Sequence, residues 1–242
     1  MLKLHYNLEK VSMGLVAGII LAASVGGIVE IAPLFTIEET VAIPDDLRPH
    51  TPLEIAGRDI YMREGCYACH SQMIRSLADE IDRYGPYSLA AESAWDRPML
   101  WGSKRTGPDI ARLGGKYSDD WHVAHLIDPR AVVPVSIMPS YPWLMRRLDI
   151  ELLGDSIATL GRLGAPYDDE MIARAGADAL AQSRPDSAGA DEVRARYGDD
   201  IAVRAFDGDP ARLTEMDAIV AYLQSLGPLP DAAHVLVAED AP

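Results

Sequence analysis

The chain has 242 residues and a net charge of −15, with 22 Lys and Arg against 37 Asp and Glu. Binding to nucleic acid needs a basic surface, so this balance argues against a nucleic-acid partner. The acidity is concentrated in residues 149–242, which carry 7 basic and 19 acidic groups. Such a segment favours solubility, or else the electrostatic steering of a basic partner.

The N-terminal region contains a long apolar run. Residues 11–29 (VSMGLVAGIILAASVGGIV) include no charged residue. As a helix they would span about 28 Å, close to the roughly 30 Å hydrocarbon thickness of a bilayer. The run is longer than the apolar core of a signal peptide, so we predict a retained transmembrane anchor over residues 11–35.

Charges at the two ends of this run predict its orientation. Lys3 and Lys10 precede it, and the charged residues that follow it before Arg48 are all acidic. The positive-inside rule therefore places residues 1–10 in the cytoplasm and exports the rest of the chain.

The anchor also carries a stripe of small residues, which recur every four positions. On a helix they form one smooth face, which another membrane helix could approach closely. We therefore expect a partner within the membrane. The members of the stripe are Gly14, Gly18, Ala22 and Gly26.

A polar linker is predicted over residues 36–50, and a helix begins directly after it. Thr51 and Glu54 form a capping-box pattern, and Pro52 suits the first turn. Apolar residues along one side carry this helix up to Cys66. From Ser76 to about Leu148, dense turn signals predict short helices between long loops.

Further helices are predicted over residues 149–165 and 215–227, with a tail over 229–242 that shows no sign of order. The helices that begin at residues 52 and 215 should cross, with Gly57 making room for Tyr222. Between them, residues 168–214 are acidic and rich in alanine. We expect this acidic segment to be a peripheral helical insertion or a mobile excursion.

The chemistry of the chain centres on Cys66, Cys69 and His70, which include its only two cysteines. A disulfide at this spacing would close almost no loop, and a thioredoxin-like redox pair needs a βαβ context that is missing here. Zinc would need further ligands of the same kind. The C-x-x-C-H pattern is instead typical of c-type haem attachment, in which both thiols bond the porphyrin and the histidine binds the iron.

The second axial ligand should come from far along the chain. We favour Met138, because Pro139 stiffens its loop and a thioether sulfur stabilises ferrous iron. With both axial positions filled, the iron has no open site for oxygen and should transfer single electrons. The other candidates are Met99, Met145, His122 and His125, of which the histidines are expected to be structural.

Three basic residues could contact the haem propionates. Lys104, Arg105 and Arg112 lie in the stretch GSKRTGPDIARLGG, where Gly107 and Pro108 could pass close to the haem edge. The alternative is an ordinary solvated turn, and the sequence does not decide between the two.

Several stretches together resemble one protein family, the mono-haem cytochrome c subunit (subunit II) of cbb3-type cytochrome c oxidases. They include GCYACHSQMIR, WGSKRTGPDIARLGGKYSDDWHVAHLIDPRAVVP and MPSYPWL. The resemblance implies a mainly α protein, with one N-terminal transmembrane helix and a class I cytochrome c-like haem domain with long loops over residues 51–228. It also implies one covalent haem c on Cys66 and Cys69, with His70 and Met138 as axial ligands.

The resemblance further implies partners and a location. The family subunit takes electrons from a di-haem cytochrome c subunit or a soluble cytochrome c. It passes them to haem b of a haem–copper catalytic subunit, where oxygen is reduced. This places the chain in a bacterial inner membrane with its haem domain in the periplasm.

The chain departs from the family pattern in two places. Ser76-Leu77 stands where Pro-Phe is usual, and the acidic segment is longer than usual, so no family role is carried over to it. Three alternatives stay open: a free-standing anchored cytochrome c, a nitric oxide reductase cytochrome c subunit, and a thiol–disulfide or haem-sensing module.

Overall fold

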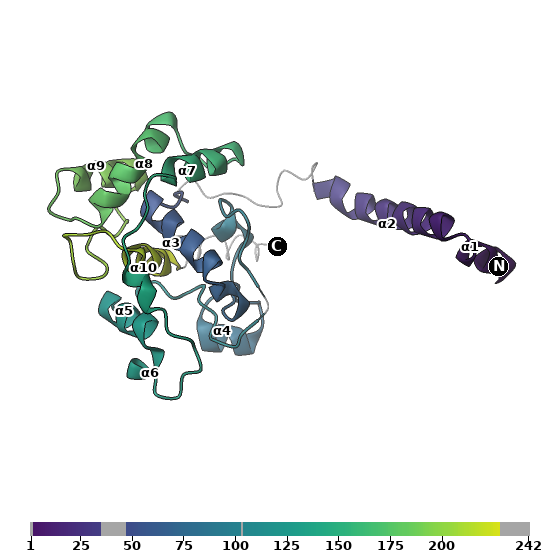
Figure 1. Ribbon diagram of the computed structural model, residues 1–242, viewed down its shortest axis with the longest axis horizontal. Helices are drawn as coiled ribbons and strands as arrows, with labels where there is room; N and C mark the ends of the chain where they lie inside the picture. Colours follow the sequence, from purple (N-terminus) through teal and green to yellow (C-terminus); the bar gives the residue numbers. More distant parts are fainter. Residues whose placement is uncertain (1, 35–46, 103, 228–242) are drawn as a thin grey trace, which may run out of the picture. The chain divides into compact units, whose positions relative to one another are not determined.

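A computed structural model describes residues 2–34, 47–102 and 104–227, which fall into two separate units, Met1–Ile43 and Pro44–Pro242. The first unit contains α1 (Leu2–Glu9) and α2 (Ser12–Leu34) (Figure 1). Helix α1 was not expected from the sequence. Most of the predicted linker, and the whole predicted tail over 229–242, lie outside the described residues.

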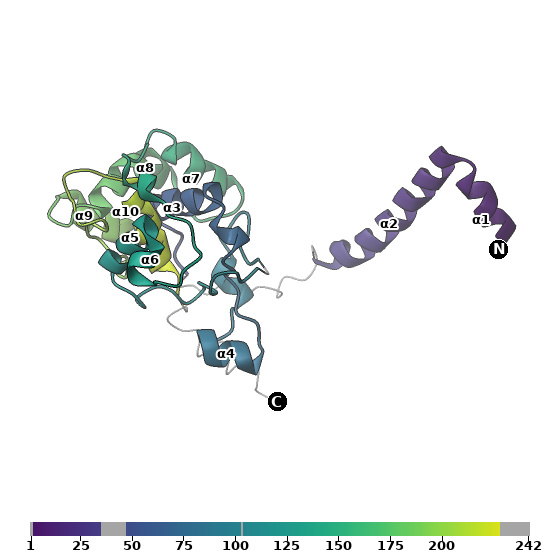
Figure 2. The ribbon, with the colours of Figure 1, turned by 60° about the horizontal axis from the view of Figure 1, so that its bottom comes forward.

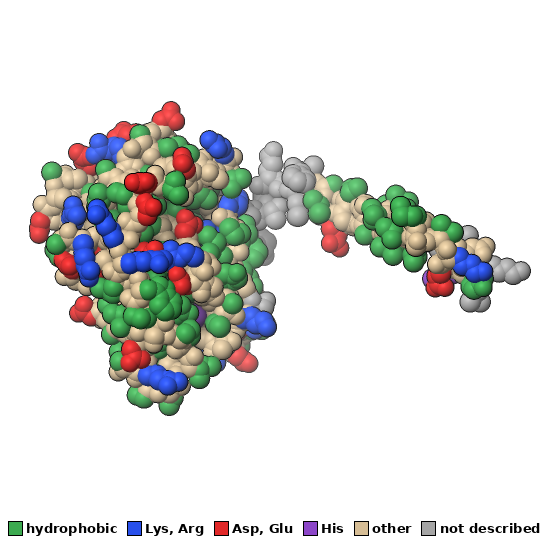
Figure 3. Space-filling model, viewed as in Figure 1, with side chains coloured by type: hydrophobic (Ala, Val, Ile, Leu, Met, Phe, Trp, Pro, Cys, Tyr) green, Lys and Arg blue, Asp and Glu red, His purple; other side chains and the backbone are tan. Residues whose placement is uncertain are grey.

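Helix α2 confirms the single apolar helix that the sequence predicts. Its stretch Ser12–Pro33 has 22 residues and a mean hydropathy of 2.2. Apolar side chains dominate the face of this helix seen in Figure 3. At about 1.5 Å per residue the stretch spans roughly 33 Å, enough to cross a bilayer.

The second unit is helical, as expected, and its described residues form no strand beyond a single bridge between Arg147 and Thr214. The α-helices are α3 (Pro52–Arg63), α4 (Ala78–Tyr84), α5 (Asp119–Ile127), α6 (Pro129–Val132), α7 (Leu153–Arg162), α8 (Asp169–Gln182), α9 (Gly189–Tyr197) and α10 (Glu215–Ser225). Three short 3-10 helices lie among them: η1 (Cys66–Ala68), η2 (Ala90–Ser93) and η3 (Pro142–Met145).

Both central helices begin with a capping box. At α3 the Thr51 hydroxyl accepts a hydrogen bond from the Glu54 N–H, and the Glu54 carboxylate accepts one from the Thr51 N–H. At α10, Thr214 and Asp217 repeat the arrangement. These caps satisfy N–H groups that a helix start otherwise leaves unpaired, so each start is fixed by local sequence.

Helices α3 and α10 cross in the middle of the unit, where Gly57 allows their backbones to touch (Figure 1). A Cβ atom on Gly57 would lie 1.9 Å from the Ala218 carbonyl oxygen and 2.7 Å from the Tyr222 Cβ. The predicted pairing of Gly57 with Tyr222 is therefore confirmed, and no larger residue fits at this crossing.

The acidic segment corrects one expectation, because it contributes to the main core. Ala175 and Ala179 of α8 are buried in the same hydrophobic cluster as α3 and α10, and so is Phe206. The Thr51 hydroxyl also donates a 2.6 Å hydrogen bond to the Gln182 side chain. In both ribbon views α7 and α8 lie beside α3, and α9 packs on α8 (Figures 1 and 2). The segment is a layer of the domain, not a peripheral excursion.

The chain enters the second unit through a cluster of buried charges. Arg48 donates a 2.8 Å hydrogen bond to Glu54, and His50 lies 3.4 Å from Glu54 and 3.5 Å from Asp96. Burial alone would lower the pKa of His50, but the hydrogen bonds of Asp96 and then Glu54 outweigh burial and raise it to about 9. His50 is therefore charged at neutral pH, and residues 47–50 are fixed to the domain.

We expect Gly57→Ala to destabilise the second unit by roughly 3 kcal/mol, because the added methyl group collides with backbone atoms that cannot move aside. The matched control is Gly176→Ala within α8, where the nearest atom to the new Cβ lies at 3.5 Å. That control should be neutral or slightly stabilising. Denaturant unfolding of the two variants checks the prediction, and equal stabilities would contradict the close crossing.

His50 should make the stability depend on pH. Because its folded pKa of about 9 exceeds the unfolded value of about 6.5, its contribution is complete below pH 6.5 and is lost as the pH rises through 9. The difference in unfolding free energy between the native chain and His50→Gln should shrink over this window by up to about 3 kcal/mol. Burial would raise the pKa of Glu54, but the charge of Arg48 and its hydrogen bonds lower it to about 2, so Glu54 does not titrate here.

Denaturant unfolding of both chains from pH 6 to pH 10 measures this difference. A difference that stays constant across the series would show that the charge of His50 does not contribute.

Candidate functional site

The two cysteines lie on one tight turn at the end of α3. Gly65 adopts a left-handed conformation, with φ of +74°, which ends the helix and starts η1. The N–H groups of Cys69 and His70 both donate to the Cys66 carbonyl, at 3.1 and 2.9 Å. Cys66 is half-buried against the main core, whereas Cys69 is exposed. The turn thus presents both thiols and the imidazole within a very short stretch of chain.

Two properties of the thiols bear on the alternative roles of this motif. The two cysteines are free rather than joined in a disulfide, and no group of three or more His, Cys, Asp or Glu side chains among the described residues could hold a metal ion. Burial, and then the charge of Glu64, raise the pKa of Cys66 to about 11. A thiol with so high a pKa is a poor redox nucleophile at neutral pH, so a thioredoxin-like pair is disfavoured.

The His70 ring is held in one orientation by the backbone of a distant loop. Its Nδ1 lies 2.8 Å from the Pro108 carbonyl oxygen, which can only accept a hydrogen bond. Nδ1 therefore carries the proton, and the lone pair of Nε2 is available to a metal. The backbone of His70 is held as well, because the Tyr61 hydroxyl donates a 3.1 Å hydrogen bond to the His70 carbonyl.

Gly107 makes this close approach possible. A Cβ atom there would lie 2.2 Å from the His70 Cε1 atom. The loop is also joined to the motif by backbone hydrogen bonds, from Gly107 to Cys69 at 3.0 Å and from Ile110 to Ser71 at 2.9 Å. From the sequence, Gly107 and Pro108 could lie either near the haem edge or in a solvated turn, and their contact with His70 was not predicted.

The loop that carries Met138 comes to the same place. Met138 is partly buried and packs on the main core, as do Cys66 and Tyr141. Burial, and then the neighbouring Cys66 and Cys69, raise the pKa of Tyr141, three residues after Met138. The Trp143 indole N–H also donates to Glu64, at the end of α3, at 3.2 Å. These contacts bring the predicted ligand loop to the attachment turn.

The other methionine candidates are Met145 and Met99. Met145 is also partly buried against the core, whereas Met99 is 43% exposed. Met145 ends η3, which directly follows Tyr141, so it lies on the same stretch of chain as Met138. Met138 stays the predicted ligand because Pro139 stiffens its loop.

The two histidines of α5 lie near the site without hydrogen-bond partners. Burial, and then the nearby His70, lower the pKa of His125, while burial lowers that of His122 to about 4. The Nδ1 atom of His125 and the Nε2 atom of His122 are buried, and no described residue pairs with either. An unpaired polar atom inside a protein is costly, so these atoms fit a site that a further polar group completes.

The His125 ring is stacked on two aromatic rings. Its imidazole lies 4.6 Å from the Trp121 ring, which in turn lies 4.0 Å from the Tyr117 ring, with all three nearly parallel. The stack fixes the position of His125 relative to α5.

The three predicted propionate contacts have different environments. Arg105 donates to Ser71 at 2.9 Å and to Glu80 at 2.6 Å, and Arg112 forms a two-pronged pair with Glu92. Lys104 is exposed and has no ion pair among the described residues. The propionate role of all three stays a prediction, and Arg105 and Arg112 could take it only alongside these carboxylates.

Taken together, these residues fit a covalently attached haem. Two thiols share one turn, the imidazole of His70 leaves Nε2 available, and the buried Nδ1 of His125 lacks a partner nearby. This fit is argued from the two thiols and the imidazole of the turn, and from the unpaired Nδ1 of His125.

Gly107→Ala should displace the His70 ring and break its hydrogen bond to Pro108. We expect a large loss of low-spin haem absorbance per chain, because the ligand then loses its orientation. Gly161→Ala in α7 is the control, since its Cβ would meet nothing closer than 3.7 Å. Visible spectra of the two purified variants decide, and an unchanged spectrum for Gly107→Ala would contradict the arrangement.

A comparison with known proteins identifies one family. The model of one family, described as the mono-haem subunit of cytochrome c oxidase, or FixO, matches residues 5–229. The match includes the apolar helix, the cysteine turn, the Met138 loop and the acidic segment. No curated protein matches the chain. Since the match covers nearly the whole sequence, the chain belongs to the FixO family of mono-haem cytochrome c oxidase subunits.

Proposed function

We propose that the chain carries one haem c, bound through thioether bonds to Cys66 and Cys69, with His70 and Met138 as axial ligands. The observation that carries this proposal is the hydrogen bond from His70 Nδ1 to the Pro108 carbonyl within a C-x-x-C-H turn. It selects the tautomer that an iron ligand needs, in a chain of the mono-haem family.

When bound, haem supplies a one-electron redox centre. His70 offers Nε2 in a fixed orientation, because Pro108 and Gly107 hold the other edge of the ring. Met138 offers a neutral thioether, which favours the ferrous state and raises the reduction potential. Two protein ligands leave no position for oxygen, so this subunit acts as an electron carrier and oxygen reduction takes place elsewhere in the oxidase.

The partners follow from this role. Electrons come from a di-haem cytochrome c subunit or a soluble cytochrome c, and leave to haem b of a haem–copper catalytic subunit. Helix α2 anchors the chain in the bacterial inner membrane beside that subunit, with the N-terminus in the cytoplasm and the haem domain in the periplasm. The small residues of α2 and the lysines before it support this arrangement.

The alternatives are less well supported. A free-standing anchored cytochrome and a nitric oxide reductase subunit would share the anchor and the cysteine turn. The FixO family, however, is a family of cytochrome c oxidase subunits, and its model matches residues 5–229 rather than the turn alone. This coverage favours the oxidase.

Two measurements test the proposal directly. The intact chain from its native host should carry the mass of one haem, and Cys66→Ala/Cys69→Ala should remove it. Gentle detergent purification through a tag on the chain should recover a haem–copper subunit. A chain that carries haem but is recovered alone would refute the oxidase assignment and leave the electron-carrier role.

Met138→Ala should open one axial position. The ferrous protein should then bind carbon monoxide, and its reduction potential should fall, because the thioether no longer stabilises ferrous iron. Met145→Ala is the control, since Met145 is also partly buried in the same cluster. Carbon monoxide difference spectra and redox titration separate the two, and an effect confined to Met145→Ala would reassign the ligand.

A further inference from the structure

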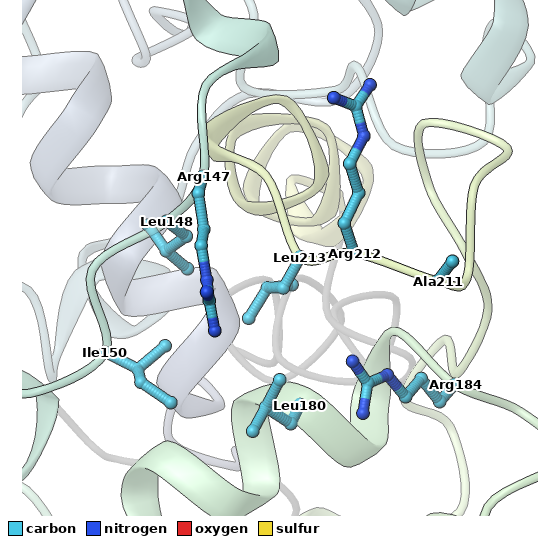
Figure 4. Close-up of a pocket in the computed structure, with 8 residues that line it drawn as sticks. All are labelled: Arg147, Leu148, Ile150, Leu180, Arg184, Ala211, Arg212 and Leu213. Atoms are coloured by element: carbon cyan, nitrogen blue, oxygen red, sulfur yellow. The ribbon is translucent and has the colours of Figure 1, made fainter.

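A second candidate site lies away from the cysteine turn, between the core and the acidic segment. It is a cavity of about 270 Å³. Leu148 and Ile150 line it from the stretch before α7, Leu180 from α8, and Leu213 from the stretch before α10 (Figure 4). No residue of the proposed haem site lines it.

The floor of the cavity is apolar and held in place. In Figure 4 the side chains of these four residues gather around the hollow. Leu148 and Leu213 belong to the main core, and the Leu148 N–H donates a 3.0 Å hydrogen bond to the Leu213 carbonyl. The bridge between Arg147 and Thr214 joins the same two stretches. An apolar surface of this kind suits an alkyl group.

Two arginines flank this apolar floor. Arg147 and Arg184 extend beside the hollow in Figure 4, whereas Arg212 points away from it and pairs with Asp209 at 3.1 Å. Within the described residues neither Arg147 nor Arg184 has an ion pair or a side-chain hydrogen bond. Lys and Arg side chains are also prominent around α10 on the face seen in Figure 3.

Within residues 168–214, all of which the structure describes, Arg184 is the one arginine without a carboxylate partner. The other arginines of the acidic segment all contact carboxylates, and the net charge of the chain is −15. Carboxylates are therefore abundant, yet none of those described reaches Arg147 or Arg184. The paired arginines are Arg174, Arg194, Arg196, Arg204 and Arg212.

We propose that this cavity binds a phosphate ester that carries an alkyl chain. The phosphate lies between the guanidinium groups of Arg147 and Arg184, and the alkyl chain covers the floor formed by Leu148 and Leu180. A guanidinium matches phosphate oxygens in a two-pronged geometry, and phosphate offers enough oxygens for two such groups. The volume lies just below the usual range of small-molecule sites, about 300–1,000 Å³, and so fits a small head group with a short alkyl segment.

The test uses the full haem-loaded chain in nanodiscs of phosphatidylcholine. Calorimetric titration with butyl phosphate should show one saturable site, with an affinity at least tenfold higher than that of inorganic phosphate. Arg147→Gln and Arg184→Gln should each weaken the binding of butyl phosphate at least tenfold. Arg162→Gln is the matched control, because Arg162 is exposed on α7 and has no ion pair among the described residues.

Three outcomes would overturn the proposal: no saturable binding, equal affinities for the two phosphates, or the same loss in Arg162→Gln as in the cavity variants. Both cavity arginines lie outside the hydrophobic core, so the variants should keep the native haem spectrum and melting temperature. A loss of binding is then not a loss of folding. None of these outcomes depends on electron transfer.

A second arm identifies the source of the ester. Dihexanoyl phosphatidylglycerol is titrated under the same conditions, and dihexanoyl phosphatidylcholine corrects for partition into the nanodisc. If dihexanoyl phosphatidylglycerol binds and Arg184→Gln abolishes this binding, the result supports a lipid head group as the natural ligand. Binding of butyl phosphate alone supports a soluble phosphate monoester in the same cavity.

Discussion

The crossing of α3 and α10 is the constraint on which the other parts of the haem domain depend. At Gly57 the two backbones touch, so the relative position of the helices has almost no freedom. Helix α3 ends directly at the cysteine turn, and the hydroxyl of Tyr222 in α10 exchanges hydrogen bonds with the side chain of Gln72, two residues after His70. The same contact therefore sets the position of the attachment turn.

Other close backbone contacts extend this arrangement towards the site. Gly114 donates a hydrogen bond to the Leu226 carbonyl just after α10, and a Cβ atom on Gly114 would lie only 2.4 Å from that oxygen. Gly107 lies in the same stretch of chain and touches the His70 ring. The loop that orients the proposed ligand is thus fixed at one end by α10 and at the other by the ring itself.

The sequence predicted the features that depend on local pattern. The apolar run, the capping box at Thr51 and the helix from residue 215 all follow from residues close together in the chain, and the structure contains each of them. The crossing at Gly57 was also predictable, because a glycine inside a good helix usually marks a close contact. The C-x-x-C-H pattern alone identified the cysteine turn as the candidate site.

Features that depend on distant contacts were not predictable in the same way. The hydrogen bond between His70 and Pro108 joins a side chain to a backbone atom 38 residues away, and no residue pattern encodes such a bond. The acidic segment looked peripheral because Ala175 and Ala179 are small and give a weak apolar signal, although both are completely buried or nearly so. The pairs of Arg105 with Glu80 and of Arg112 with Glu92 likewise join residues that are 20 or more positions apart in the chain.

The group that orients the His70 ring is a backbone carbonyl, that of Pro108, and this has an evolutionary consequence. A peptide carbonyl is present whatever side chain follows it, so position 108 can change its residue and keep the acceptor, provided the loop keeps its path. Gly107 cannot be replaced in the same way, since even a methyl group there would overlap the His70 ring. Substitutions, natural or engineered, should therefore be tolerated at position 108 and not at Gly107.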